Sequence, residues 1–376
     1  MYISKLFNNI TPSGTVAFTS LIQALREEGR DVIDLAVGEP EFAVDRPIVD
    51  ATCQALQKGQ TRYGPVSGLP ALRERLAAKF GGCGSQNIII TNGAKQGLYE
   101  IFQVICGEGR EVILPTPCWV SFNHQIRMSG GVPVSVPTLE NQLDIQRIAD
   151  AINDRTAAIL INSPNNPTGA VYDRAAIADI VELCLRNDLW LISDEAYADF
   201  VYGNNPAMSP FVFPEIRPQL LIVRSFSKTY AMTGFRIGYV VAPEEIVQRL
   251  STLQGHMTGN VCTFAQYGAL CATEISRETR EQRRLGYEKR RDCAVSLCRD
   301  LFDVIEPGGA FYLFPSLERY SARYGDDRKF SRYVLKEANV AVVPGTFFGA
   351  PGHIRLSFAT STERLTQGFA RLKEVL

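Results

Sequence analysis

The chain has 376 residues, and its 39 basic and 40 acidic residues give a formal net charge of -1 at pH 7. A chain of this length usually forms more than one domain, and its balanced charge gives no long-range attraction to nucleic acid or to an anionic membrane. Its nine cysteines include no Cys-x-x-Cys pair and it has only three histidines, so we expect neither a disulfide framework nor a metal site.

The N-terminal residues 1–5 lack the apolar core of a signal peptide, so we do not expect one. No stretch of the chain approaches the roughly 18–20 apolar residues that a membrane span needs. We therefore expect a cytoplasmic protein that binds neither nucleic acid nor a membrane.

From about residue 88 onward, apolar runs of strand length alternate with longer helical patterns. This alternation is typical of an α/β protein with a mainly parallel sheet. The expected strands are residues 88–90, 112–114, 157–161, 189–192, 220–223 and 237–241, and a helix is expected over 95–105.

Five of these strands lead into polar or otherwise unusual residues. The segments that follow them contain Gly93 and Ala94, then Trp119, Asn166, Asp194 and Lys228. Because the carboxyl ends of parallel strands meet at one edge of a sheet, we expect these residues to form a single site.

A long charged helical stretch over residues 274–301 separates this sheet from a C-terminal block with its own expected strands, 310–314 and 340–343. We therefore expect a second, smaller domain. The predicted division is a large domain over residues 46–285 and a small domain formed by both termini, residues 1–45 and 286–376.

Lys228 is the candidate for covalent chemistry. It lies just beyond the apolar run 220–223, at the end of a strand that we expect to be buried on both faces. Desolvation lowers the pKa of an ammonium group, and a neutral amine can form a Schiff base with an aldehyde cofactor. The alternative is a lysine on a solvated loop.

A phosphate site is suggested by Gly93 and Ala94, which open a helix after a strand. The free N–H groups of a helix N-terminus and its dipole can hold a phosphate, and Ser225, Ser227 and Arg236 could add charge-assisted bonds. Neither of the glycine-rich nucleotide motifs occurs in the chain. The alternative is a loop that binds nothing.

Three further residues each have two readings. Asp194 follows an apolar run, where an ionised carboxylate needs a cationic partner, although an Asp there could simply cap the next helix. Arg355 interrupts a strand-like alternation and could bind a carboxylate, or could lie on the surface. Trp119 could stack on a planar ligand or pack in the core.

Several segments resemble one family. Ser225-Phe226-Ser227-Lys228, followed by Gly234-Phe235-Arg236-Ile237-Gly238, resembles the lysine segment of the class I aminotransferases, which are pyridoxal-phosphate enzymes of fold type I. Asn165-Asn166-Pro167-Thr168-Gly169 looks like that family's Asn-Pro-Thr-Gly loop, and Ser193-Asp194-Glu195-Ala196-Tyr197 like its Asp-Glu-x-Tyr segment. The resemblance spans nearly the whole chain and includes Gly38-Glu39-Pro40, Tyr63-Gly64-Pro65 and the Arg355 strand. It implies an α/β fold: a large domain with a mainly parallel seven-stranded sheet flanked by helices, plus a smaller α/β domain.

The resemblance also implies roles around pyridoxal 5'-phosphate. Lys228 would hold the cofactor covalently and then move the proton at the substrate Cα, and Asp194 would pair with the protonated pyridine nitrogen. Trp119 would stack on the ring, while Asn166 and Tyr197 would hydrogen-bond its phenolic oxygen. Lys228, Asp194 and Tyr197 are thus the expected catalytic residues.

The phosphate of the cofactor would be held by Gly93, Ala94, Ser225, Ser227 and Arg236. By the same resemblance, Tyr63 would reach the phosphate bound to the neighbouring subunit. A homodimer with shared active sites is therefore the expected assembly.

The substrate α-carboxylate would be held by Arg355, with the Gly38 backbone, Asn166 and Trp119 beside it. Lys95 and Thr15 resemble residues that recognise a distal carboxylate in the aspartate and prephenate aminotransferase branch.

The expected activity is therefore transfer of the amino group of an L-amino acid to a 2-oxo acid by a ping-pong mechanism. Acidic donors such as aspartate or glutamate are favoured and aromatic donors are possible. Lys95 could instead be an ordinary first-turn helix residue, and His256 could alter specificity or merely pack. The alternative activity is a lyase, decarboxylase or cyclase of the same fold.

Overall fold

The protein is built around a seven-stranded sheet. The structure, a computed structural model, describes residues 14–203 and 208–376, with the backbone alone for residues 14–19. The strand order is β2-β8-β7-β6-β5-β3-β4; β8 runs antiparallel to β2 and to β7, and the other neighbouring strands are parallel. The strands are β2 (Ile88–Thr91), β3 (Glu111–Thr116), β4 (Val132–Pro137), β5 (Thr156–Asn162), β6 (Trp190–Asp194), β7 (Leu220–Ser225) and β8 (Gly238–Val241). The expected mainly parallel sheet is confirmed.

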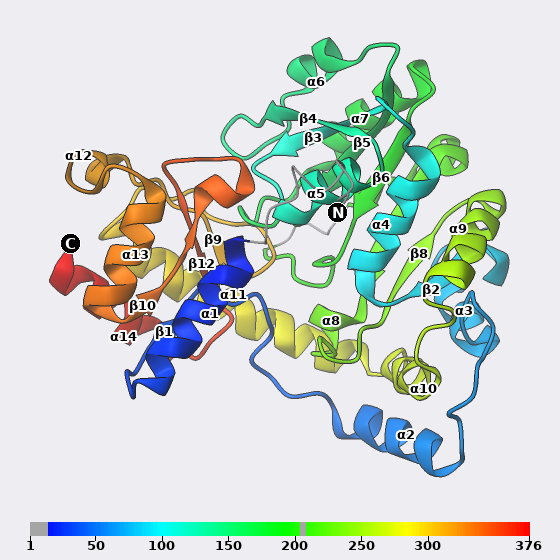
Figure 1. The fold of residues 1–376 in the computed structure, drawn as a ribbon, viewed down its shortest axis with the longest axis horizontal. Coiled ribbons are helices and arrows are strands. Elements are labelled where there is room, and N and C mark those ends of the chain that lie inside the picture. Colours follow the sequence, from blue (N-terminus) through cyan, green and yellow to red (C-terminus); the bar gives the residue numbers. More distant parts are fainter. Residues whose placement is uncertain (1–13, 204–207) are drawn as a thin grey trace, which may run out of the picture.

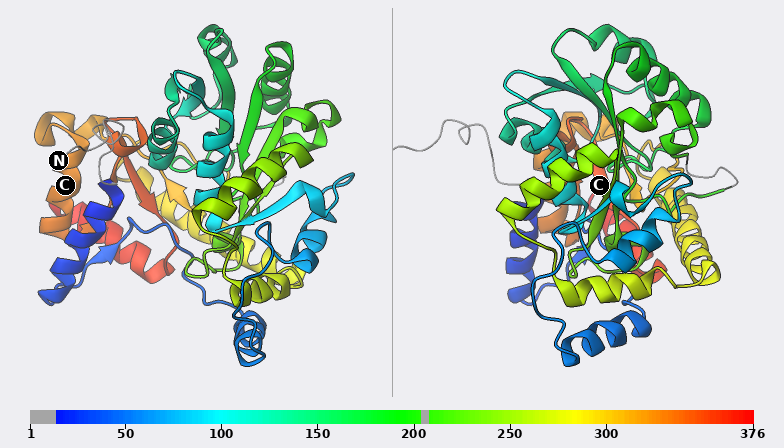
Figure 2. Two further views of the ribbon diagram at one scale, coloured as in Figure 1. Left: turned by 45° about the vertical axis from the view of Figure 1, so that its right-hand side comes forward. Right: turned by 90° about the vertical axis from the view of Figure 1, so that its right-hand side faces the viewer.

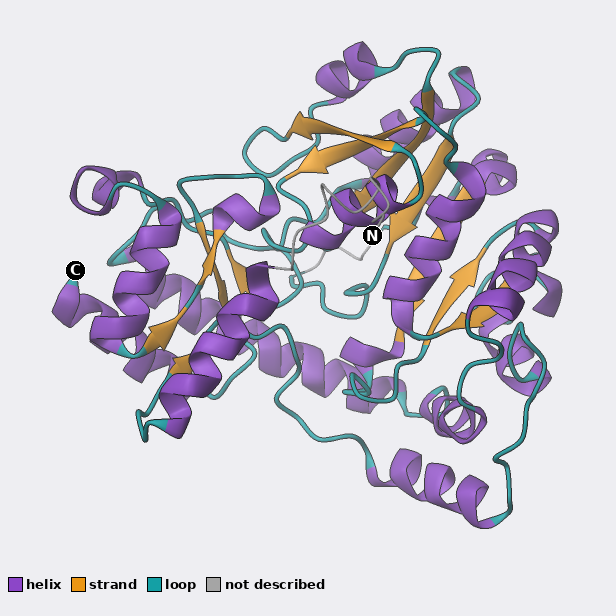
Figure 3. Cartoon of the chain, in the orientation of Figure 1, coloured by secondary structure: helices purple, strands orange, loops and turns teal. Residues whose placement is uncertain are grey.

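Helices cover both faces of this sheet (Figures 1 and 3). The helices of this part of the chain are α2 (Arg46–Gln57), α3 (Pro70–Ala77), α4 (Gly93–Ile105), α5 (Val120–Met128), α6 (Ile145–Ala151), α7 (Arg174–Arg186), α8 (Phe226–Thr229), α9 (Glu244–Met257) and α10 (Thr263–Ala272), of which α2 packs against α10. Short 3-10 helices lie at Ser85–Asn87, Pro210–Val212, Pro214–Gln219, Glu318–Tyr320 and Gly345–Phe348.

The apolar strands bury both of their faces, because alternate residues of a strand point to opposite sides of a sheet. In β7, Leu221 and Val223 belong to the core shared with α4, α5 and α9. Leu220 and Ile222 belong to the core shared with α3, α6, α7 and α10. Burial on both faces explains why β7 reads as a continuous apolar run.

The C-terminal part contains two smaller sheets beside the large one (Figure 2). Their strands are β1 (Ile33–Asp34), β9 (Tyr312–Leu313), β10 (Val340–Ala341), β11 (Val343–Pro344) and β12 (Ile354–Ser357), in the orders β1-β10 and β11-β12-β9. Their helices are α1 (Gly14–Glu27), α11 (Arg277–Arg299), α12 (Ser321–Tyr324), α13 (Asp327–Ala338) and α14 (Thr362–Val375). Ile22 of α1 packs against Leu335 and Ala341, so the N-terminal helix lies with the C-terminal elements.

Two expected strands of this block need correction. The expected strand 340–343 is two strands, because Val340–Ala341 pairs with β1 whereas Val343–Pro344 pairs with β12. Within 310–314 only Tyr312–Leu313 is a strand. The long helical stretch is confirmed as α11, whereas the proposed division into two domains stays a prediction.

No helix in the described ranges is long and apolar enough to cross a membrane.

Candidate active site

A cavity of about 480 Å³ lies at the carboxyl ends of β5, β6 and β7 and reaches across to β9 and β12. It is lined by most of the residues that the sequence singles out, namely Gly38, Ala94, Lys95, Trp119, Asn166, Asp194, Tyr197, Ser225, Ser227, Lys228, Arg236 and Arg355. Residues that follow separate strands therefore line one cavity, as expected, whereas the role of each stays a prediction.

Lys228 lies in α8, immediately after β7, and its Nζ donates a hydrogen bond to the Gly38 carbonyl at 2.5 Å. Burial lowers the pKa of its ammonium to about 8, although the carboxylate of Glu39 opposes this shift. A lysine with this pKa holds an appreciable neutral fraction near neutral pH. The alternative reading of Lys228 as a solvated loop residue is wrong.

Asp194 is the last residue of β6 and is only 4% exposed. Its Oδ1 accepts a hydrogen bond from the Ala196 N–H at 3.1 Å, so it does cap the following turn. Burial, with a smaller contribution from Glu195, raises its pKa to about 7. No cationic side chain of the described residues forms an ion pair with it, so this carboxyl is suited to a cationic ligand group such as a protonated pyridine nitrogen.

Glu195, the next residue, serves a different purpose. Its Oε2 accepts from Arg224 Nε at 2.8 Å and from Nη2 at 2.5 Å, in a partly buried ion pair. Its other oxygen, Oε1, accepts from the Ser193 and Ser209 hydroxyls. Of the two consecutive carboxylates, only Asp194 lines the cavity.

The N-terminus of α4 lies beside Arg236. The helix begins at Gly93, whose φ is +74°, and a Cβ there would lie 2.5 Å from Arg236 Nη2. Ser225 caps α8 and accepts a hydrogen bond from the Ser227 N–H at 3.1 Å. Free backbone N–H groups beside a guanidinium and two hydroxyls are a suitable set of donors for a phosphate.

Arg355 is another cationic group of the cavity and is 5% exposed, so the interpretation as a surface residue is wrong. Its Nη1 donates to Asn166 Oδ1 at 2.9 Å and its Nη2 to the Ala36 carbonyl at 2.7 Å. Its Nε is buried and has no hydrogen-bond partner. An unpaired donor on a buried guanidinium is suited to a carboxylate from a ligand.

Trp119 and Lys95 lie together at another side of the cavity. The Lys95 Nζ is 4.9 Å from the centre of the Trp119 ring, and burial lowers its pKa, as does Arg236. The Trp119 ring also packs edge-on against Phe122 at 5.3 Å. Trp119 therefore lines the cavity and also contributes to the core.

Three predicted residues do not line the cavity. Tyr63 lies on the segment between α2 and α3 and is 97% exposed, and His256 lies in the last turn of α9. Gly93 only borders the cavity, through its contact with Arg236. The side chain of Thr15 lies outside the described part of the chain.

Tyr312 and Phe348 line the cavity although the sequence reading assigns them no role. The Tyr312 hydroxyl is 2.8 Å from that of Tyr197. The rings of Tyr312 and Phe348 lie against the Arg355 guanidinium, at 4.4 Å and 5.0 Å. The local sequence around Tyr312 does not indicate these contacts, because they depend on how β9 packs beside the large sheet.

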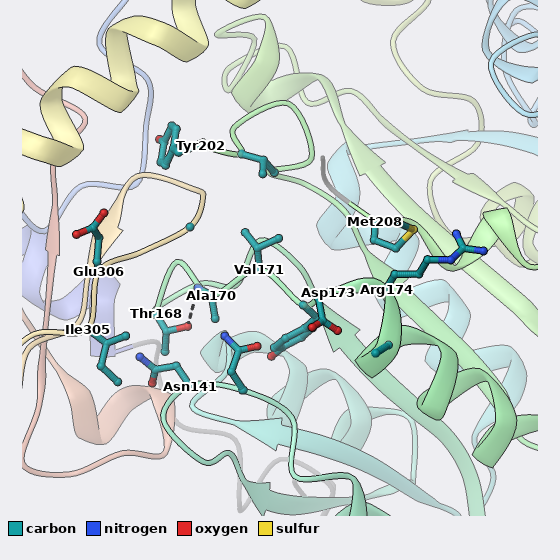
Figure 4. Close-up of a pocket in the computed structure, with 15 residues that line it drawn as sticks. Asn141, Thr168, Ala170, Val171, Asp173, Arg174, Tyr202, Met208, Ile305 and Glu306 are labelled. Carbon is teal, nitrogen blue, oxygen red and sulfur yellow. Dashed lines mark hydrogen bonds between the residues drawn. The ribbon is translucent and has the colours of Figure 1, made fainter. Parts of the chain in front are cut away.

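A second cavity, of about 520 Å³, borders the same loop that carries Asn166 (Figure 4). It is lined by Thr168, Tyr202 and Glu306 among others, and Thr168 Oγ1 accepts from the Ala170 N–H at 3.1 Å. None of the predicted site residues with described side chains lines it. The smaller cavity is therefore the candidate active site because of its chemistry, not its size.

Comparisons with known proteins identify the family of this chain. A family model for aminotransferase class I and II matches residues 30–372. The chain is 43% identical to a probable aspartate/prephenate aminotransferase of Aquifex aeolicus, over 100% of this chain and 98% of that protein. It is 39% identical to an aspartate aminotransferase of Geobacillus stearothermophilus, over 99% and 98%. The solved structure of aspartate aminotransferase from Thermus thermophilus with maleate matches with a TM-score of 0.95 at 36% identity, covering 100% of both chains. This chain belongs to the class I and II aminotransferases.

Proposed function

We propose that this aminotransferase takes its amino group from an acidic amino acid, aspartate or glutamate, and gives it to a 2-oxo acid. The observation that carries the proposal is that two cations from different elements, Lys95 of α4 and Arg355 of β12, line one cavity. A dicarboxylic amino acid offers two anionic groups, and each would have its own cation. The aspartate aminotransferases among the relatives support this choice.

Aminotransferases of this kind use pyridoxal 5'-phosphate. The residues around the cavity fit this group. The N-terminus of α4, with Ser225, Ser227 and Arg236, would hold the phosphate, and the uncompensated Asp194 carboxyl would pair with the protonated pyridine nitrogen. When bound, the cofactor supplies an aldehyde that accepts the amino group and a cationic ring that takes up the electron pair left on the substrate Cα.

Lys228 would first hold the cofactor through its amine and then, once released by the substrate, take the proton from the substrate Cα. Both tasks need the neutral amine, and the pKa of about 8 that burial gives Lys228 makes this form available. The Gly38 carbonyl, which accepts from Nζ at 2.5 Å, would keep the amine on the side of the cavity where the α-carboxylate binds.

Arg355 would bind the α-carboxylate through the side of its guanidinium that includes the unpaired Nε. Asn166 and the Ala36 carbonyl fix the guanidinium, so that the substrate is held in one orientation. Orientation decides which bond at Cα is broken. Tyr197 and Asn166 would donate to the phenolic oxygen of the cofactor, and Trp119 would lie against its ring.

The donor preference depends on Lys95 and is tested with two variants. In Lys95→Ala we expect kcat/KM for aspartate to fall by about 10–100-fold, because a buried charge-assisted hydrogen bond is lost. Alanine has no distal carboxylate, so its kcat/KM should change by less than about threefold. Lys95→Arg retains the charge and should keep the order of preference for the donors.

The measurement is the loss of the cofactor's visible absorption in single-turnover reactions with aspartate, glutamate, phenylalanine and alanine. Equal losses for all donors in Lys95→Ala would refute the role of Lys95. A wild-type enzyme that prefers phenylalanine would show that the substrate is aromatic. No observation favours the lyase, decarboxylase or cyclase alternative, and a strict need for a 2-oxo acid in multiple turnovers would exclude it.

A homodimer in the cytoplasm is the assembly that we propose. Tyr63 is a large aromatic residue with 97% of its surface exposed, on the segment Tyr63-Gly64-Pro65 that resembles its counterpart in the family. Such exposure is expected of a side chain that completes the active site of a second copy.

A further inference from the structure

Tyr312 lies between the two sides of the cavity. It belongs to β9, pairs with Ser357 of β12, and is 1% exposed. Its side chain reaches the loop after β6, where Tyr197 lies. It therefore connects a residue expected to contact the cofactor with the strand that carries Arg355.

The hydroxyl of Tyr312 is 2.8 Å from the hydroxyl of Tyr197, in a buried contact where either atom can be the donor. Each phenol has a single proton, so one hydroxyl donates and the other accepts. If Tyr197 is to donate to a ligand oxygen, its own oxygen must accept the proton of Tyr312. Donation from Tyr312 also polarises Tyr197 and strengthens the bond that Tyr197 makes.

The ring of Tyr312 contacts the Arg355 guanidinium, whose carbon lies 4.4 Å from the ring centre. Phe348 lies against the same guanidinium at 5.0 Å. The Tyr312 hydroxyl also fills the space beside Gly38, because a Cβ on Gly38 would lie 2.6 Å from it. The Tyr312 side chain thus lies against Tyr197, which is expected to act at the cofactor oxygen. It also lies against Arg355 and Gly38, which are expected to bind the α-carboxylate.

We propose that Tyr312 is a positioning residue with two separable effects. Its hydroxyl directs the proton of Tyr197 toward the phenolic oxygen of the cofactor, and its ring holds the Arg355 guanidinium in place for the substrate carboxylate. The proposal rests on the proposed function, because it assumes that Tyr197 and Arg355 have the roles given above.

Both phenols stay protonated in the working range of pH. Burial raises the pKa of Tyr312. The Arg355 charge opposes this shift, and the Glu39 charge adds to it. Burial also raises the pKa of Tyr197, with Tyr312 and Asp194 adding to the shift and Arg355 opposing it. The pair therefore acts through the direction of its hydrogen bonds, not through the loss of a proton.

The two effects are separated by two substitutions in the holoenzyme. Tyr312→Phe removes the hydroxyl and keeps the ring. We expect the pKa read from the visible absorption of the bound cofactor to rise by about half a unit or more, because the phenolate is less well stabilised. The dissociation constant of maleate, followed by the same absorption, should change by less than about twofold because the ring remains.

Tyr312→Leu removes the ring as well. We expect a similar shift of the absorption pKa together with a rise of about tenfold in the maleate dissociation constant. Tyr202→Phe is the matched control, since it removes a buried hydroxyl that bonds to the Ala310 carbonyl and lines the other cavity (Figure 4). It should change neither quantity.

A double variant tests the route through Tyr197. In Tyr197→Phe, adding Tyr312→Phe should shift the absorption pKa no further. An additional shift, or an unchanged pKa in Tyr312→Phe alone, would overturn the first effect. If the maleate dissociation constant of Tyr312→Leu stayed within about twofold of the wild-type value, the second effect would be overturned. Failure of wild-type enzyme to bind maleate would instead contradict the proposed acidic substrate.

Discussion

Lys228 and Asp194 differ in charge type, yet burial moves both of their pKa values toward neutrality. The Lys228 pKa falls from 10.5 to about 8, whereas that of Asp194 rises from 3.8 to about 7. The cause is the same, since burial disfavours whichever form is charged. For Lys228 the shift makes a nucleophile available. For Asp194 the shift arises because the buried carboxylate has no cationic partner. A protonated pyridine nitrogen would supply that cation.

The raised pKa of Asp194 predicts that the free energy of unfolding of the protein without cofactor depends on pH. The folded chain keeps the Asp194 proton up to about pH 7, whereas the unfolded chain releases it near its ordinary pKa of 3.8. Because the folded state binds more protons between these values, the free energy of unfolding falls as the pH rises through this window. In Asp194→Asn this fall is absent.

We therefore expect the stability of the Asp194→Asn apoprotein, relative to wild-type apoprotein, to increase by on the order of 2–3 kcal/mol between pH 5 and pH 8. Urea denaturation at the two pH values measures it. Asp150→Asn, at an exposed position, is the control and should show no such increase. A difference between Asp194→Asn and wild type that is constant with pH would contradict the raised pKa.

At the scale of elements, the strands of the large sheet and their ends were easier to predict from the sequence than the strands of the small sheets. Strands β2, β3, β5, β6 and β7 are apolar because both faces are buried, and each leads directly into polar residues, so the sequence shows both the strand and its end. Strand β4 was missed. It contains Pro133 and Pro137 and lies at the edge of the sheet, where a residue without an N–H is tolerated.

The small sheets could not be predicted from their local pattern. In residues 340–343 a change of pairing partner divides one apolar run into β10 and β11, and nothing in the run marks the division. The same holds for Tyr312, whose contacts with Tyr197 and Arg355 join segments that lie far apart in the sequence. Motifs revealed the residues expected to touch the cofactor, but only the packing revealed what holds them.

The start of α4 gives a prediction at this scale. Gly93 has a φ of +74°, and a Cβ there would lie 2.5 Å from Arg236 Nη2. Gly93→Ala should therefore displace Arg236 from the proposed phosphate site and raise the dissociation constant of pyridoxal phosphate by about tenfold or more. Titration of the apoprotein with the cofactor, followed by absorption, gives this constant.

Gly109→Ala is the matched control for Gly93→Ala. Gly109 has nearly the same φ, +75°, but a Cβ there would meet nothing within 4 Å. Its substitution should cost about 1–2 kcal/mol of stability from the left-handed backbone alone, with no change in cofactor affinity. If both variants weakened cofactor binding equally, backbone strain and not the displacement of Arg236 would be the cause.

On the scale of the whole molecule, the candidate site is assembled from parts that fold around different cores. Asp194 and Lys228 come from the large sheet, whereas Arg355 and Tyr312 come from the C-terminal sheets. A relative movement of these parts would change the distance between the carboxylate site and the amine. In the proposed homodimer, Tyr63, with nearly all of its surface exposed, would add a further part from a second copy of the chain.

A shared site can be tested by mixing two inactive or weakened proteins. Lys228→Ala lacks the essential amine, and Tyr63→Ala would lack the group that reaches the partner's phosphate. In a heterodimer of the two, one site combines Lys228 from the Tyr63→Ala subunit with Tyr63 from the Lys228→Ala subunit, and so has neither defect. After unfolding and refolding together, random pairing should restore about a quarter of wild-type activity at limiting cofactor, because half of the dimers are mixed and each has one intact site.

The control is a mixture of Tyr63→Ala subunits with subunits that carry both Tyr63→Ala and Lys228→Ala, since no site in that mixture is intact. Recovery no greater than in this control would mean that each subunit completes its own site and that Tyr63 has no role in the partner's.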